Sequence, residues 1–453
     1  MRMRRRSPIL RCETYIGGRA EMSVKPLHGF LRGTLRRLLT GEGRIVLTSR
    51  VPSLEDRLGG IEEFGLYLHI PFCRQICSYC PYNKELYHPE VAREYVRAVR
   101  REIDLYSSLV GQKPVTSFYI GGGTPTTMLH SGLPEILDQV FRVFNMQCEI
   151  HLESHPNDLS AENLDSIASL GVEHLSIGVE ALQDRHLRML GRPYTAWQVK
   201  EAVGRAAEAG LKCVNADMIF ALPGQMLSEV EQTGRELVEL GVDQVAAYPL
   251  FSFPYTRLGS EVRAERNQNC GVLRRRKMMR ILEEIFYAAG YERTSVWAFT
   301  RRGAPKYCSV AVPLYLGLGA SAGSYLRDIF YLNTFNVNEY INSLEQGRMP
   351  IALSLELSKP MQMAGWLYWR IYETRFRKRD FQKRFGRGFD SVFGTYLRPL
   401  SWVSLLRDDG EEVVLSDEGT YWLHVLEDLF SIDYVGKLWG ISQRDPWPEK
   451  VVL

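Results

Sequence analysis

The sequence has no long apolar run and no excess of charge of one sign. No stretch of its 453 residues approaches the roughly 18 consecutive apolar residues that a membrane-spanning helix needs. A net charge of +3 creates no overall electrostatic field that would attract nucleic acid or an anionic membrane surface. We therefore expect neither a membrane span nor a nucleic-acid partner.

The beginning of the chain lacks the apolar core of a secretion signal. Its Arg-rich start, MRMRRR, is followed by SPILRCETYIGG, which is too short and too polar for that role. We expect a cytoplasmic protein whose residues 1–60 form an N-terminal extension. Within it, residues 26–43 (PLHGFLRGTLRRLLTGEG) have the pattern of a basic amphipathic helix that ends at glycine.

Cysteine is scarce except in one short segment, and a disulfide framework is not expected. Five of the eight cysteines are scattered along the chain: Cys12, Cys148, Cys213, Cys270 and Cys308. In a long chain without a secretion signal, scattered cysteines are usually reduced thiols. The apolar runs around Cys148 and Cys213 indicate that these two are core residues.

Apolar β-type runs alternate with amphipathic stretches of helical length between residues 61 and 300. The six β-type runs are GLYLHI, TSFYIGGG, EIHLES, HLSIGV, CVNADMIF and QVAAYPL. Their period of roughly 30 to 40 residues is typical of a parallel sheet with right-handed crossovers. Six units are too few for a closed eight-stranded barrel. We therefore predict an α/β fold built on a partial (β/α)6 TIM-like barrel.

The same patterns divide the chain into segments. Residues 61–300 are predicted to form the partial barrel, and the Gly- and aromatic-rich residues 301–349 to cap or close its sheet. Residues 350–453 are rich in helical patterns and are predicted to form a small, mainly helical C-terminal domain. Parallel sheets bind ligands at the carboxyl ends of their strands, so the functional site is expected there.

The remaining three cysteines follow the first β-type run, at the predicted ligand-binding edge. In HIPFCRQICSYCPYNK (residues 69–84), Cys73, Cys77 and Cys80 have the spacing C-x3-C-x2-C. One possibility is a zinc site with a fourth protein ligand such as His88, although structural zinc usually takes its ligands from two hairpin-like segments. The alternative is an iron–sulfur cube held by three thiolates, which leaves one iron for a small chelating cofactor.

These cysteines and the segments after them resemble the radical S-adenosylmethionine superfamily, and within it the oxygen-independent coproporphyrinogen III oxidase-like branch with its haem-chaperone relatives. The segments that match in order and spacing are GLYLHIPFC, FYIGGGTPT, IHLESHP, LSIGVE, LGRPYT, NADMIFALPGQ, LGLGASAGSYL and LSDEGTYWLH. The resemblance implies a [4Fe-4S] cluster on Cys73, Cys77 and Cys80. It also implies S-adenosylmethionine bound to the free iron and cleaved reductively to a 5′-deoxyadenosyl radical.

A pocket for S-adenosylmethionine is implied around the cluster. Gly121 to Gly123 would let the backbone approach the methionine part of the cofactor. Arg192 would pair with the cofactor carboxylate, and acidic side chains would accept hydrogen bonds from its ammonium and hydroxyl groups. The predicted cofactor-binding residues are Tyr67, Tyr79, Gly122, Gly123, Thr124, Glu153, Glu180, Arg192 and Asp217.

One departure from the branch bears on the reaction. Coproporphyrinogen oxidases usually carry a fourth cysteine two residues after the third, and this sequence has Tyr82 there. In the family that cysteine is not a cluster ligand but is associated with decarboxylation. The resemblance implies oxidative decarboxylation of propionates on a tetrapyrrole such as coproporphyrinogen III. Radical methyl transfer or cyclopropanation of another substrate, and a haem-binding chaperone, are the alternatives.

The implied partners are small molecules and an electron donor. The substrate is expected to be a tetrapyrrole, the donor a protein such as flavodoxin or ferredoxin, and one or two molecules of S-adenosylmethionine would bind. The basic residues from Arg274 to Arg280 would either meet propionate groups of the substrate or form the solvated face of a helix.

Overall fold

The computed structural model describes most of the chain, namely residues 36–37, 40–50, 53–264, 270–307 and 313–453. The Arg-rich start, Cys12 and Cys308 lie outside the described residues, as does most of the helix predicted for residues 26–43. Among the helices that are described, none is long and apolar enough to cross a membrane.

Six parallel strands form the centre of one large sheet, as the sequence predicted. They are β2 (Phe64–Ile70), β5 (Pro114–Gly122), β7 (Ile150–Ser154), β8 (Val172–Glu180), β9 (Cys213–Phe220) and β10 (Gln244–Pro249). Each pairs in parallel with the next in this order. Most of their side chains are buried on both faces, which explains the nearly continuous apolar runs in the sequence.

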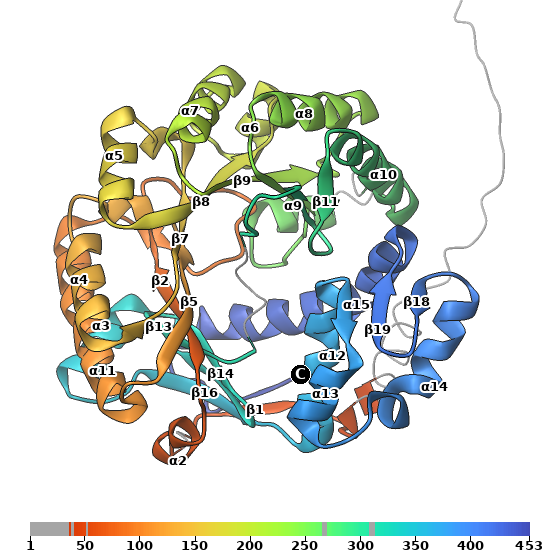
Figure 1. Cartoon of the computed structure of the whole chain (residues 1–453). Coiled ribbons are helices and arrows are strands. Elements are labelled where there is room, and N and C mark those ends of the chain that lie inside the picture. Colours follow the sequence, from red (N-terminus) through yellow and green to blue (C-terminus); the bar gives the residue numbers. More distant parts are fainter. Residues whose placement is uncertain (1–35, 38–39, 51–52, 265–269, 308–312) are drawn as a thin grey trace, which may run out of the picture.

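Amphipathic helices connect these strands. They are α3 (Pro89–Val110), α4 (Leu133–Val143), α5 (Ala161–Ser169), α6 (Asp184–Leu190), α7 (Ala196–Glu208) and α8 (Leu227–Glu239). In α3, for example, Val96, Val99, Ile103 and Tyr106 are buried at helical spacing. Figure 1 shows α4, α5, α7 and α8 on the outside of the curved sheet.

The sheet continues beyond both edges of the parallel strands without closing into a barrel. Beyond β10 lie the antiparallel strands β12 (Ala298–Arg301) and β11 (Tyr291–Arg293). Next to β2 lies β13 (Tyr315–Leu318), which is parallel to it. The order then runs through β14 (Gly323–Leu326), β15 (Ile329–Asn333), β16 (Ile351–Glu356), β1 (Val46–Thr48) and β20 (Lys450–Val452). Within residues 313–349, the strands β13, β14 and β15 therefore extend the sheet on the β2 side.

Shorter elements complete this part of the molecule. They are α2 (Glu55–Gly59), β3 (Phe72–Cys73), β4 (Glu85–Leu86), β6 (Asn145–Met146), α9 (Arg257–Ala264), α10 (Val272–Ala288) and α11 (Val337–Glu345). The strands β3 and β4 pair with each other and frame the loop that carries the clustered cysteines.

The C-terminal part contains four helices and a small sheet. The helices are α12 (Lys359–Tyr372), α13 (Lys378–Phe385), α14 (Phe389–Trp402) and α15 (Asp417–Ser442). The sheet, which the sequence analysis did not predict, has the order β17 (Arg375–Arg377), β19 (Glu412–Leu415), β18 (Leu406–Asp408). A separate apolar core around Trp366, Phe381 and Phe389 holds these elements together. Both β16 and β20 belong to the large sheet, where each pairs with β1. The division of the chain into two domains at residue 350 therefore stays a proposal.

Arg276 of α10 has a structural role that neither sequence-based interpretation described, whereas Arg274 and Arg280 are exposed, as the solvated-face interpretation expects. Arg276 is 5% exposed, and its Nη1 donates to both carboxylate oxygens of Glu283 at 3.0 and 2.9 Å. Its Nη2 donates to Glu418 of α15 at 2.9 Å, and Arg280 donates to the same oxygen. Arg276 is thus buried and is not part of the lining of the cavity described below; it links α10 to α15.

Candidate functional site

A cavity of about 560 Å³ lies at the carboxyl ends of the parallel strands. Its wall includes eleven of the twelve predicted site residues: Cys73, Cys77, Tyr79, Cys80, Gly122, Gly123, Thr124, Glu153, Glu180, Arg192 and Asp217. The exception is Tyr67, whose hydroxyl pairs with Nδ1 of His69 at 2.8 Å. The ring of Tyr67 lies 6.1 Å from that of Tyr119, which does line the cavity. Its contact with a cofactor stays a prediction.

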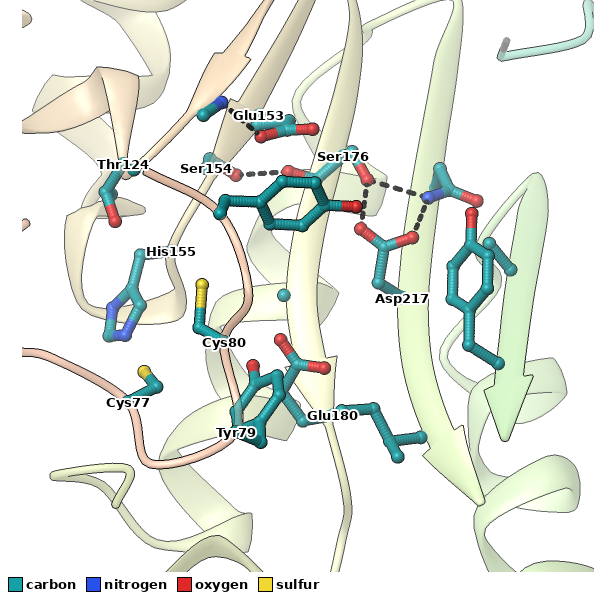
Figure 2. Close-up of a pocket in the computed structure, with 18 of the residues that line it drawn as sticks. Cys77, Tyr79, Cys80, Thr124, Glu153, Ser154, His155, Ser176, Glu180 and Asp217 are labelled. Atoms are coloured by element: carbon teal, nitrogen blue, oxygen red, sulfur yellow. Dashed lines mark hydrogen bonds between the residues drawn. The ribbon is translucent and has the colours of Figure 1, made fainter. Parts of the chain in front are cut away.

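The cysteine loop is held in place by hydrogen bonds to the end of α6. The backbone N–H of Ser78 donates to Leu190 O at 3.1 Å, and its hydroxyl donates to Met189 O at 3.0 Å. The Lys84 ammonium donates to the carbonyls of Cys80 and Tyr82 at 2.7 and 3.0 Å. Figure 2 shows Cys77, Tyr79 and Cys80 on this one loop, in front of the strands that carry Glu153, Glu180 and Asp217.

The thiols fit a metal cluster better than a single metal ion. In the part of the chain that the structure describes, no three His, Cys, Asp or Glu side chains are arranged to hold one ion. A zinc ion needs four donors about 2.0 to 2.3 Å from one point. His88, the candidate fourth zinc ligand, is exposed and is not part of the cavity wall. Three thiols spaced along one wall suit a larger iron–sulfur group.

Burial keeps the free thiols protonated. It raises the pKa of Cys73 to about 11 and the pKa of Cys80 to about 12. The Thr124 hydroxyl, 3.6 Å from Cys73 Sγ, opposes this shift at Cys73. Iron would therefore displace protons when it binds, as expected for thiolate ligands.

Two glycines bring bare backbone to the cavity wall. Gly122 has φ +117°, and a Cβ atom there would lie 2.5 Å from His69 Cε1. A Cβ atom on Gly123 would lie 2.8 Å from the carbonyl oxygen of Phe72. Neither position has room for a side chain, so packing against His69 and Phe72 requires glycine at both, and the backbone of these glycines itself forms part of the cavity wall.

Glu180 and Arg192 form a buried ion pair at the end of β8. Their side chains are 10% and 7% exposed, and Arg192 Nη2 also donates to the Tyr79 hydroxyl at 2.7 Å. Glu180 has φ +64°, a strained conformation for a residue other than glycine. The Arg192 Nε is buried without a hydrogen-bond acceptor among the described residues. This arrangement leaves one charged donor for a ligand carboxylate.

Comparisons with known proteins agree with this geometry. The family model of the radical SAM superfamily matches residues 67–237. The heme chaperone HemW of Bacillus subtilis is 27% identical over 360 residues, which cover 78% of this chain and 95% of that protein. The oxygen-independent coproporphyrinogen III oxidase of Bradyrhizobium diazoefficiens is 25% identical over 383 residues, covering 79% and 84%.

This chain belongs to the radical SAM superfamily. Its fold is that of the coproporphyrinogen III oxidase HemN from Escherichia coli, with a TM-score of 0.74 at 19% identity. That match covers 87% of this chain and 94% of the solved one. The superfamily implies a [4Fe-4S] cluster and S-adenosylmethionine, and the three thiols, the glycine turn and Arg192 fit this pair of groups.

Two further carboxylates in the cavity are held by fixed donors. Glu153 accepts from the Tyr119 hydroxyl at 2.5 Å and from the Gly122 N–H at 2.9 Å. Asp217 accepts from the Ser176 hydroxyl at 2.8 Å and from Asn215 Nδ2 at 3.0 Å. Burial raises the pKa of both carboxyls, and burial together with Glu180 raises that of Asp217 to about 7.

Several residues that line the cavity were not predicted from the sequence. They are Tyr119, His155, Ser176 and Asn215, which all line the cavity. Two of them could have been found from strand alternation, since Ser176 lies four residues from Glu180 on β8 and Asn215 two residues from Asp217 on β9. His155 follows β7, and Figure 2 shows it beside Thr124 and Cys77. No pattern in the sequence marks it.

Proposed function

We propose that this protein is a radical SAM enzyme that acts on a tetrapyrrole, with the cluster on Cys73, Cys77 and Cys80. The observation that carries the proposal is that the three thiols, the glycine turn and the Arg192–Glu180 pair line one cavity. When both are bound, the cluster and S-adenosylmethionine supply reductive cleavage of a carbon–sulfur bond and a carbon radical that abstracts hydrogen from substrate.

The chain's own residues bind and orient the cofactor. Arg192 Nε, which lacks an acceptor, would donate to the cofactor carboxylate. Gly122 and Gly123 would let the methionine part lie against backbone. Glu153 and Asp217, each held by two donors, would accept from the ammonium and ribose hydroxyl groups.

Tyr79 would limit the access of water to the cluster. It lies between Cys77 and Cys80 in the sequence and lines the cavity with them, and its hydroxyl accepts a hydrogen bond from Arg192. The Arg192 guanidinium carbon lies 5.8 Å from the centre of the Tyr79 ring. Tyr79 would thus cover one side of the cluster and keep solvent from it.

The tetrapyrrole assignment rests on the named relatives. Our first candidate is the oxidative decarboxylation of coproporphyrinogen III propionates, with a flavodoxin or ferredoxin as electron donor and one or two molecules of S-adenosylmethionine. A haem carrier is the second candidate, which Tyr82 favours. Tyr82 lines the cavity at 52% exposure where coproporphyrinogen oxidases usually have a cysteine.

One anaerobic incubation tests the proposal. Reconstituted protein is mixed with dithionite, S-adenosylmethionine and coproporphyrinogen III, and the products are analysed by mass spectrometry. We expect 5′-deoxyadenosine together with a tetrapyrrole that has lost carbon dioxide. Release of 5′-deoxyadenosine without a change in tetrapyrrole mass would exclude decarboxylation. Stable haem binding with no cleavage of S-adenosylmethionine would favour the carrier.

A further inference from the structure

The cavity extends beyond the predicted cofactor residues into a second half with a different character. Its wall there is formed by the end of β10, the loop after β10 and the last turn of α12. The aromatic residues of this half are Tyr248, Phe251, Phe253, Trp369 and Tyr372. Except for Phe253, they are only half-buried, so part of each ring surface is available to a ligand. Such a wall suits a large ligand with flat apolar faces.

The last turn of α12 is fixed against the barrel. The backbone N–H of Val296 donates to Tyr372 O at 2.9 Å. The ring of His424 packs on Trp297 and Tyr372, with centroid distances of 4.8 and 5.9 Å. The aromatic wall that α12 contributes is therefore held in place before any ligand arrives, which lowers the entropy cost of binding.

Four cationic side chains line the whole cavity, and three of them already have partners. Arg192 pairs with Glu180, and Arg74 Nε lies 3.3 Å from Asp158 Oδ1. Lys84 donates to two carbonyls of the cysteine loop. The fourth is Lys306. It forms no hydrogen bond or ion pair within 4 Å with a described residue.

Lys306 is positioned by its neighbour in the chain. The Gln244 side chain donates to Tyr307 O at 2.9 Å and accepts from the Tyr307 N–H at 3.1 Å. This pair of hydrogen bonds fixes the backbone of Tyr307 against β10. Glu373, which also lines the cavity, interacts electrostatically with Lys306 and is paired with Arg370 at 2.8 Å. No carboxylate of the described residues forms an ion pair with Lys306, so its charge can also interact with an anion in the cavity.

We propose that Lys306 binds a carboxylate of the substrate while Trp369 and Tyr372 hold its flat apolar body. The inference rests on the proposed function, because it takes the substrate to be a tetrapyrrole. A cation beside an aromatic wall suits a flat apolar ligand that carries a carboxylate at its edge, such as a tetrapyrrole propionate.

Porphyrin titrations of the full chain test this site without relying on turnover. We would measure Kd by absorbance for deuteroporphyrin IX, for its dimethyl ester and for coproporphyrin III, each in the same detergent buffer. For Lys306→Gln, the Kd of the diacid should rise about tenfold and that of the ester should not change. Lys306→Arg should retain most of the affinity. Trp369→Leu should weaken diacid and ester alike, because it removes flat contact area.

Lys359→Gln is the matched control. Lys359 is exposed at the first turn of α12, about 20 Å from the helix end at 1.5 Å per residue. The Lys359→Gln substitution should leave all three Kd values unchanged. If the wild type bound both porphyrins and Lys306→Gln lost affinity equally for the diacid and the ester, the inference about Lys306 would be overturned, but the proposed function would not. An unchanged Kd for coproporphyrin III in Lys306→Gln would have the same consequence, because that ligand also carries carboxylates. Absence of porphyrin binding by wild-type protein that cleaves S-adenosylmethionine would overturn the tetrapyrrole assignment as well.

Discussion

The Arg192 side chain has fewer acceptors than a buried guanidinium needs. It is 7% exposed, pairs with Glu180 and donates to Tyr79, yet its Nε has no acceptor in the described part of the chain. Leaving a buried charged donor unsatisfied costs free energy, and a ligand carboxylate at Nε would recover it. The arginine fork is also better suited than an ammonium to a carboxylate.

Replacing Arg192 by lysine should therefore weaken cofactor binding. We expect Arg192→Lys to raise the Kd for S-adenosylmethionine by roughly 10- to 100-fold, the value of a charge-assisted hydrogen bond. Anaerobic isothermal titration would measure this. Arg235→Lys, an exposed change in α8, is the control and should bind normally. Equal affinities for the two variants would argue against a cofactor role for Arg192.

The cysteine assignment predicts a clear difference between two single substitutions. Cys77→Ala should lose the brown colour and most of the bound iron and sulfide, because it removes one of three cluster ligands. Cys148→Ala, at a half-buried thiol away from the cavity, should keep both. Iron and sulfide are assayed after anaerobic reconstitution. Full iron content in Cys77→Ala would contradict the assignment.

The site residues that could be predicted from the sequence lie in short contiguous motifs. The three cysteines and the glycine turn are contiguous motifs, so their spacing alone marks them. His155 is a single polar residue after a strand, and only the folded chain brings it to the cysteine loop. The aromatic wall of α12 was missed for the same reason. More than 100 residues separate Trp369 from β10, and no local pattern shows that they meet.

Among the elements that line the cavity, the end of β5 has a strict steric requirement. Gly122 combines φ +117° with a Cβ position that lies 2.5 Å from the His69 ring. An alanine would add left-handed backbone strain and a clash with a buried ring. By contrast, Gly204 lies inside α7 with nothing within 4 Å of its Cβ position.

These two glycines should respond to alanine in opposite ways. Gly122→Ala should lower the free energy of unfolding by roughly 2 to 5 kcal/mol, the sum of strain and overpacking. Gly204→Ala should raise it by about 0.5 to 1 kcal/mol, since alanine favours the helix. Urea unfolding followed by circular dichroism measures both. A neutral Gly122→Ala would mean that the turn is less constrained than its geometry indicates.

Element prediction succeeded where the pattern was long. The six strands and their helices each contain several turns or alternations, and tertiary packing then follows the same apolar positions. The sheet of β17, β18 and β19 was missed because its strands have only three or four residues. In β17 only Phe376 is buried, so no alternation can be recognised.

At the scale of the whole molecule, His424 joins the C-terminal helices to the barrel. Its Nδ1 lies 3.1 Å from Glu427 Oε2 and its Nε2 3.2 Å from Asp428 Oδ1, while its ring packs on Trp297 of the barrel. Burial disfavours the charged ring, but the two carboxylates outweigh burial and raise the pKa of His424 from 6.5 to about 9. The protonated ring therefore stabilises the folded chain.

This shift sets the direction of a pH effect. Since the folded pKa of His424 is raised, its stabilisation is complete below pH 6.5 and is lost as the pH rises through about 9. His424→Gln should therefore lose a smaller part of its stability between pH 6.5 and 9 than the wild type. Urea unfolding at both pH values measures the difference. His130 is exposed, so His130→Gln is the control and should behave as the wild type. If the free energy of unfolding of His424→Gln changed between pH 6.5 and 9 as much as that of the wild type, the prediction would be refuted.

The most direct test of the account is the electron paramagnetic resonance spectrum of the reduced, reconstituted chain with and without S-adenosylmethionine. Three protein thiols should give a four-iron cluster with one iron open to the cofactor. The account predicts a [4Fe-4S] signal whose g values change when S-adenosylmethionine is added. A signal that does not respond to the cofactor, or protein that assembles no four-iron cluster, would contradict it.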